Sequence, residues 1–160
     1  MIEFREGDVT KSGADIICHQ TNCRGVMGSG LARQIKMENP EMFHRYVAHC
    51  KQFGDRLLGT ALILPMDQDL YKKSSDMRYI ANCFGQAGYG RDKVYTQYKA
   101  LESALARVAA FARSYNKRSI AIPYNIGCGL AGGKWDIVES IIRHVLGGPD
   151  FDVTIWRYEP

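Results

Sequence analysis

Short apolar runs alternate along this chain with longer segments in which apolar residues recur every three or four positions. The short runs are typical of strands, and the longer spacing is typical of amphipathic helices. We expect strands at 1–5, 14–18, 60–64, 78–84, 119–122 and 153–156, and helices at 31–39, 41–53, 96–115 and 135–146. This alternation predicts a single α/β domain over residues 1–160, with three α/β/α layers and a central mixed six-stranded sheet.

Helix-breaking residues support these boundaries. Pro40 disfavours helical backbone at the residue before it, and Gly54 and Gly147 stand where helices should end. The polar segment 67–76 is predicted to be a surface loop.

The stretch 16–35 combines a strand end, a polar cluster, a glycine-rich loop and the start of a helix. Residues 19–22 are polar, and Gly25, Gly28 and Gly30 follow within a few positions. Glycine lets the backbone approach a ligand closely, and free amides at a helix start attract anions. The stretch therefore predicts an anion site.

Two further glycine-rich loops, at 85–93 and 125–133, also follow predicted strands. In open α/β sheets ligands bind beyond the carboxyl ends of the strands, so we expect the three loops to converge on one crevice. Many amide donors with few fixed cations suit a nucleotide diphosphate better than a lone phosphate.

Composition narrows the class of protein only slightly. The net charge of +4 fits an acidic ligand but is too small to argue for nucleic acid alone. No apolar run approaches the ~20 residues of a membrane span, and the N-terminus does not read as a signal peptide. The five cysteines are odd in number and lack C-x-x-C spacing. We therefore expect buried thiols in a cytoplasmic protein that does not contact membranes.

The sequence gives little support for a dinucleotide site, a P-loop, a metal site or a cysteine nucleophile. The first loop reads G-x-x-G-x-G rather than G-x-G-x-x-G, and G-K-[ST] is absent, so neither a Rossmann dinucleotide site nor a P-loop is predicted. His44 and His49 lack the H-E-x-x-H pattern of a metal site. Cys128 could be a nucleophile, but no histidine lies near it in sequence. We expect neither a metal nor a cofactor.

His19 is the candidate for proton transfer. It follows a predicted buried strand at the expected ligand edge, and an imidazole can exchange protons near neutral pH. A hydrogen-bonded core histidine is the other interpretation that the sequence leaves open.

Several segments, taken together, resemble a macrodomain. The similarity is greatest to the branch that holds the yeast-type ADP-ribose 1''-phosphate phosphatase, the human terminal ADP-ribose–glutamate hydrolase and the macrodomain antitoxins that remove ADP-ribose from DNA. The resemblance covers nearly the whole chain and implies a macrodomain fold with ADP-ribose as ligand. The segments are G-D-V-T (7–10), T-N-C-R-G-V-M-G-S-G-L-A (21–32), L-L-G-T-A-L-I-L-P (57–65), I-G-C-G-L-A-G-G-K-W (126–135) and V-T-I-W (153–156).

The resemblance also implies ligand-binding residues. Asp8, with the Val9 backbone beside it, matches the position that binds the adenine amino group, and Trp156 stands where a residue often borders the adenine. Asn22 matches the asparagine that holds the distal ribose. The residues that would surround the distal ribose and the diphosphate are Gly25, Val26, Met27, Gly28 and Gly30 in one loop, and Ile126, Gly127, Cys128, Gly129, Leu130 and Ala131 in another.

The catalytic residues implied by the resemblance differ between branches. Ala131 replaces the aspartate of the glutamate hydrolase, and Gln86 stands near the place of its lysine. The antitoxins also rely on a lysine, for which Lys93 is the nearby candidate. The phosphatase pattern H-x-x-N-C begins at His19, and Asp92 is the candidate for the acidic residue of that branch.

We therefore expect a monomeric hydrolase that acts at the distal ribose of ADP-ribose 1''-phosphate or of mono-ADP-ribosylated substrates. A reader that binds ADP-ribose without chemistry is the alternative, because the family lysine and aspartate are missing. A third hypothesis is a hydrolase of ADP-ribosylated DNA, motivated by the first-loop match and by Arg24, Arg33 and Lys36. Nucleic acid would then be a partner only as the modified substrate.

Overall fold

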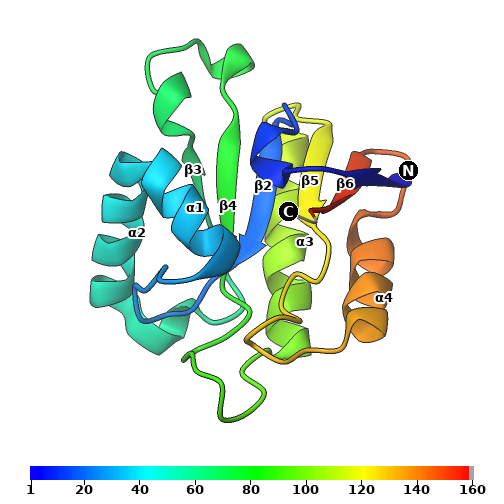
Figure 1. The fold of residues 1–160 in the computed structure, drawn as a ribbon. Helices are drawn as coiled ribbons and strands as arrows, with labels where there is room; N and C mark the ends of the chain where they lie inside the picture. The colour runs from blue at the N-terminus through cyan, green and yellow to red at the C-terminus, as the bar shows by residue number, and fades with distance from the viewer. Residues whose placement is uncertain (159–160) are drawn as a thin grey trace.

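The computed structural model describes residues 1–158, which form a six-stranded sheet flanked by helices (Figure 1). Every expected strand and helix is present, with boundaries shifted by one or two residues at most. The strands are β1 (Ile2–Glu6), β2 (Ile16–Gln20), β3 (Ala61–Pro65), β4 (Tyr79–Cys83), β5 (Ser119–Pro123) and β6 (Asp152–Arg157). The helices are α1 (Gly30–Glu38), α2 (Pro40–Phe53), α3 (Tyr98–Ser114) and α4 (Trp135–Leu146).

The sheet is mixed, as predicted. Its strand order is β1-β6-β5-β2-β4-β3, and every neighbouring pair is parallel except β3 and β4. The strand β2 therefore lies between β5 and β4, with all three running in the same direction. None of the helices in residues 1–158 combines the length and the apolar character that a membrane crossing requires.

Two apolar cores lie on opposite faces of the sheet and confirm the three-layer prediction. Ile16 and Cys18 of β2 pack in the core formed with α3 and α4, whereas Ile17 between them packs in the core formed with α1 and α2. Successive side chains of a strand point to opposite faces, and both faces are covered here. Two inner strands of the sheet, β2 and β4, are accordingly buried along almost their whole length.

Two local features differ from the predictions. The strand β2 extends to Gln20, because its pairing with β4 continues through His19 with Asn82 and Gln20 with Cys83. Both polar residues thus belong to the strand and not to a cluster after it. The segment 67–76, predicted to be a surface loop, contains two short 3-10 helices and buries one of its residues, Asp69.

Asp69, in that segment, is fully buried and pairs with two cations. Its carboxylate lies 2.9 Å from Arg78 Nε and 2.8 Å from Lys72 Nζ, and it accepts the Arg78 amide at 2.9 Å. Burial raises the pKa of this carboxyl, but the hydrogen bonds from Arg78 and Lys72 outweigh it and lower the pKa to about 2. The ionised form therefore ties the segment to the start of β4.

Replacement of Asp69 by Asn should lower the free energy of unfolding by about 2 kcal/mol at neutral pH, because two cations lose their partner. The carboxyl has a lower pKa in the folded than in the unfolded chain. Its contribution is therefore complete above about pH 4 and is lost as the pH falls toward 2. Urea unfolding of both proteins across this pH range would measure the difference.

Asp150→Asn is the matched control, since it removes one partner of the exposed Arg113–Asp150 pair. It should cost less than about 1 kcal/mol. Equal losses of unfolding free energy in the two variants would show that the burial of Asp69 does not strengthen its contribution to stability.

Candidate functional site

The carboxyl ends of β5, β2 and β4 meet at one edge of the sheet. The three glycine-rich loops follow these strands, so the parallel order of β5, β2 and β4 brings the loops together. We call them the first loop (21–29, after β2), the second loop (84–97, after β4) and the third loop (124–134, after β5). Their convergence, expected from the sequence, follows from this topology.

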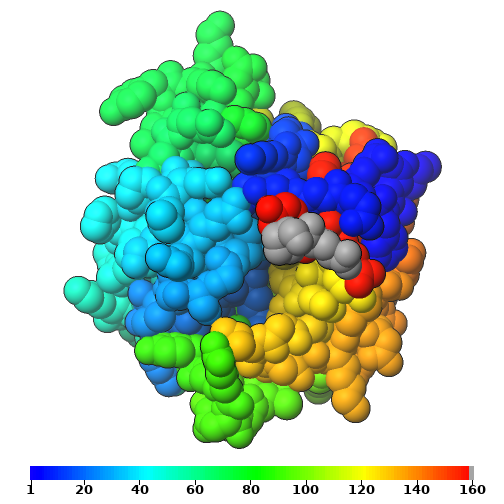
Figure 2. Space-filling model, in the orientation of Figure 1, coloured from blue at the N-terminus to red at the C-terminus, as the bar shows by residue number. Residues whose placement is uncertain are grey.

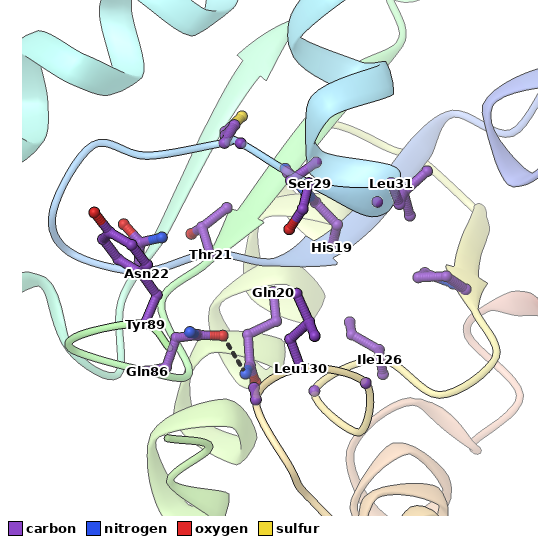
Figure 3. Close-up of a pocket in the computed structure, with 18 of the residues that line it drawn as sticks. His19, Gln20, Thr21, Asn22, Ser29, Leu31, Gln86, Tyr89, Ile126 and Leu130 are labelled. Atoms are coloured by element: carbon purple, nitrogen blue, oxygen red, sulfur yellow. Dashed lines mark hydrogen bonds between the residues drawn. The ribbon is translucent and has the colours of Figure 1, made fainter. Parts of the chain in front are cut away.

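The three loops enclose a cavity of about 610 Å³. It is lined by residues 19–22 and 26–32 on one side, 123–127 and 129–131 on the other, and Gln86 with 89–91 at one end. Figure 2 shows a hollow between the blue to cyan surface of residues 20–40 and the yellow surface of the third loop, with the green second loop below it. In Figure 3, Ser29 and Leu31 lie across this space from Ile126 and Leu130. A cavity of this size is typical of a small-molecule site.

Backbone amides without acceptors stand on both walls. In the third loop, the amides of 129–131 donate to no acceptor within residues 1–158, and in the first loop the same holds for 27–29. The helix α1 begins directly after, and its N-cap residue Ser29 makes no side-chain capping bond. The first amides of a helix lack partners inside the helix and carry partial positive charge. The two walls therefore offer facing sets of donors suited to an anion.

Asn22 shapes the first loop. Its side-chain oxygen accepts hydrogen bonds from the amides of Arg24 (3.0 Å) and Val26 (3.3 Å) and from the Tyr46 hydroxyl (3.1 Å), while its side-chain nitrogen donates to Val26 O (2.8 Å). Asn22 lines the cavity, as expected, and it also fixes the backbone turn that leads to the glycines.

His19 lines the cavity while its ring is almost completely buried. Its Nε2 lies 2.7 Å from Asn82 Oδ1, and the Asn82 amide nitrogen donates to Leu62 O at 3.0 Å. Since Asn82 Oδ1 is an acceptor, His19 Nε2 carries the proton in the neutral ring. His19 Nδ1 is buried and has no hydrogen-bond partner among the described residues.

Burial lowers the pKa of His19 to about 4, although the hydrogen bond with Asn82 opposes the shift. The imidazole is therefore neutral at physiological pH. It can accept a hydrogen bond or a proton at Nδ1, but it carries no proton there to donate. Of the acid and base roles left open by the sequence, the geometry favours the accepting one.

Most of the expected ligand-binding residues line the cavity. They are Asn22, Val26, Met27, Gly28, Gly30, Ile126, Gly127, Gly129, Leu130 and Ala131.

Gly25 and Cys128 lie in the loops but behind the cavity wall. A Cβ on Gly25 would lie 3.7 Å from Cys50, and its φ of +79° favours glycine. Burial raises the pKa of Cys128 to about 11, with a further contribution from Asp136, so this thiol is not a ready nucleophile.

The residues expected at the adenine also lie outside the cavity lining. The Asp8 carboxylate accepts hydrogen bonds at 2.8 Å from the Thr10 hydroxyl and from Gln34 Nε2. Gln34 lies on α1, the helix whose start forms one wall of the cavity. Val9 is buried in the core. Trp156 O accepts from the amide of Tyr124, which does line the cavity, at 2.8 Å. A ligand that reaches these residues must extend past the lined wall along α1.

Asp92 is not brought to the cavity. It is exposed, and its carboxylate accepts a hydrogen bond from Tyr95 OH at 2.6 Å, which lowers its pKa. This contact braces the second loop beside Gly90, where a Cβ would lie only 2.7 Å from the carboxylate. A carboxylate held ionised away from the cavity does not suit the catalytic role expected of Asp92.

Sequence reasoning missed several lining residues. Gln20 and Thr21 lie between the recognised His19 and Asn22, and each has a buried oxygen without a partner within residues 1–158. Tyr89 and Arg91 come from the second loop. The sequence placed Tyr89 and Arg91 in a loop after a strand of the same parallel set, which could have indicated their position, but no motif distinguished these side chains.

Charge is sparse around the cavity. Among the described lining residues Arg91 is the one charged side chain, and none carries a carboxylate. Arg24 forms an ion pair with Asp55, and Lys36 lies 4.5 Å over the Phe43 ring, so these two cations already have partners. No group of three side chains within residues 1–158 is arranged to hold a metal ion.

Comparison with known proteins identifies relatives along most of the chain. The chain is 29% identical over 157 residues to a DNA ADP-ribosyl glycohydrolase of Mycobacterium tuberculosis, a match that covers 98% of this chain and 42% of that protein. It is 26% identical over 178 residues to an ADP-ribose 1''-phosphate phosphatase of Saccharomyces cerevisiae, covering 95% of this chain and 97% of the other. The present chain thus spans less than half the length of the mycobacterial relative.

A solved structure of the macrodomain of Mycobacterium tuberculosis DarG superposes with a TM-score of 0.79 at 28% identity, over 100% of this chain and 98% of that one. The family model described as Macro domain matches residues 18–142, which include most of β2, all three loops and most of α4. This chain therefore belongs to the macrodomain family.

Proposed function

We propose that the cavity binds ADP-ribose and that the protein is a hydrolase acting at its distal ribose. The observation that carries the proposal is the pair of amide sets on facing walls, at 27–29 with the start of α1 and at 129–131. A diphosphate between them would meet donors from both sides at a helix N-terminus. Both named relatives act on ADP-ribose compounds, which supports the same ligand.

The orientation of the ligand follows from the two ends of the cavity. The adenine would extend along α1 toward Asp8 and Trp156, beyond the lined wall. The distal ribose would lie at the other end, near Asn22, His19 and the second loop. His19 Nδ1 would accept a proton from the attacking water or from a ribose hydroxyl, because that nitrogen is the free acceptor of a neutral ring.

Arg91 favours an anionic group at the distal end, and hence ADP-ribose 1''-phosphate as substrate. It is the one charged side chain on the described lining, and no carboxylate there opposes it. An arginine can bind phosphate oxygens through two parallel N–H bonds.

A binding module without chemistry is the second candidate. It is favoured by the lack of a carboxylate on the described lining, since cleavage of a glycosidic bond usually employs a pair of carboxyl groups. Incubation with ADP-ribose 1''-phosphate, with ADP-ribosylated protein and with ADP-ribosylated DNA, each assayed for release, would separate the candidates. Binding of ADP-ribose without any release would select the binding module.

Gly129→Glu should weaken ADP-ribose binding by roughly 30- to 100-fold, because a carboxylate would stand among the proposed diphosphate donors. A Cβ on Gly129 meets nothing within 4 Å, so the fold should tolerate the change. Isothermal titration calorimetry would give the affinity.

Gly148→Glu is the control, because a Cβ there also meets nothing within 4 Å and the site lies beyond α4. It adds the same charge and should leave the affinity within about twofold. Equal affinities for the two variants would overturn the assignment of the third loop to the diphosphate.

His19→Ala should lower turnover by roughly 10²- to 10⁴-fold while ADP-ribose affinity changes only a few-fold. In the wild-type protein, the pKa of about 4 keeps Nδ1 unprotonated at higher pH. kcat/KM should therefore be independent of His19 ionisation between pH 5 and 8 and fall as the pH drops through about 4. Steady-state assays with ADP-ribose 1''-phosphate across this range would measure both effects. Unchanged turnover in His19→Ala would exclude the proposed role.

Arg91→Ala should raise KM for ADP-ribose 1''-phosphate roughly tenfold and weaken free ADP-ribose binding much less, because only the former carries the distal phosphate. Lys93→Ala is the control, since Lys93 is two residues away, lies 5.1 Å over the Tyr95 ring and does not line the cavity. A similar change for both ligands in Arg91→Ala would refute a contact with the distal phosphate.

A further inference from the structure

The third loop is held in place from behind by the last residues of the second loop. Gly127 O accepts hydrogen bonds from Thr96 Oγ1 at 2.6 Å and from Gly133 N at 2.9 Å. Ala131 O accepts from the amides of Tyr95 at 2.8 Å and Thr96 at 3.2 Å. The two adjacent residues Tyr95 and Thr96 thus anchor both ends of the segment 127–131, which includes the acceptor-free amides of 129–131.

Gln20 sets the direction of the Thr96 hydroxyl. Its Nε2 donates to Thr96 Oγ1 at 2.9 Å, which leaves the single hydroxyl proton of Thr96 for Gly127 O. The same nitrogen donates to Gln86 Oε1 at 2.9 Å, the contact dashed in Figure 3, and Gln86 donates in turn to Gly88 O at 2.9 Å. One side chain at the end of the central strand is therefore bonded to the second loop at two points, Gln86 and Thr96, and is linked to the third loop through the Thr96 hydroxyl.

The space around Gln20 explains two of the loop glycines. A Cβ on Gly85 would lie 2.2 Å from Gln20 Oε1, and a Cβ on Gly127 would lie 2.9 Å from the same atom. At contacts this short something must shift, so a side chain at either glycine would displace the Gln20 amide. Thr96 is almost completely buried, so water could not replace the hydrogen bonds of its hydroxyl with Gln20 and Gly127 if they were broken.

We propose that Thr96 and Gln20 are positioning residues that fix the third loop in the conformation that binds the diphosphate. Neither needs to touch the diphosphate. Thr96 holds the Gly127 carbonyl, Gln20 orients the Thr96 hydroxyl, and the amides of 129–131 are thereby held in place before the ligand arrives. A preorganised loop binds more tightly because less ordering remains to be done on binding. The inference rests on the proposed function for the identity of its ligand, but the conformation of the loop can be tested in the ligand-free protein.

Thr96→Val removes the hydroxyl with little change in shape, and Thr96→Ser retains it. ADP-ribose should bind roughly tenfold more weakly to Thr96→Val and within about threefold of wild type to Thr96→Ser. Thr60→Val is the matched control, because Thr60 Oγ1 also donates to a backbone carbonyl, Leu57 O at 2.7 Å, and Thr60 does not line the cavity. It should leave the affinity within about twofold at a similar loss of thermal stability.

Amide hydrogen exchange in the ligand-free proteins provides the second measurement. Exchange at Gly133, whose amide shares the Gly127 carbonyl with Thr96, should be roughly tenfold faster in Thr96→Val than in Thr60→Val. Equal exchange in these two variants, or ADP-ribose affinity of Thr96→Val within twofold of wild type, would overturn the inference. Failure of the wild-type protein to bind ADP-ribose, with the difference in exchange still present, would instead reject the proposed ligand and leave the positioning role standing.

Discussion

Backbone amides that have no acceptor inside the protein are the feature on which the proposed site depends. An N–H group that cannot reach water or a protein acceptor is costly, so a folded chain leaves such groups only where solvent or a ligand can satisfy them. Here they occur at 27–29 and 129–131, on two loops that follow neighbouring parallel strands. The anion site is thus built from the main chain, and the side chains mainly set its shape.

Because the main chain supplies the proposed anion donors, the polar side chains at the strand ends have other roles. Asn22 holds the turn of the first loop by accepting hydrogen bonds from the amides of Arg24 and Val26, and Gln20 donates to Gln86 and Thr96 of the second loop. His19 is anchored at Nε2 by Asn82, on the neighbouring strand β4. Asn22 and Gln20 are therefore first of all supports for the loops, whereas His19 is held by the sheet and its Nδ1 has no partner within residues 1–158.

The lack of a carboxylate on the described lining of the cavity bears on the protonation of His19. Burial keeps His19 neutral, and the described lining carries no carboxylate that would draw a proton onto it. The imidazole can therefore accept a proton at Nδ1, which is the role proposed for it at the distal ribose. Asp92, which seemed a natural partner from its place in a glycine-rich loop, instead binds Tyr95 and stabilises the loop itself.

The order of strands and helices, the mixed sheet and the presence of three converging loops were all predictable from the chain alone, because apolar spacing and glycine positions are local properties. The end of β2 was not predictable in this way, since pairing with β4 carries the strand through two polar residues. The burial of Asp69, the position of Asp92 outside the cavity and the contacts of Thr96 with the third loop were not predictable either, because apolar spacing does not say which groups will surround a polar side chain. Local pattern fixes which elements form, whereas the partners and the protonation of a side chain follow from what folding places around it.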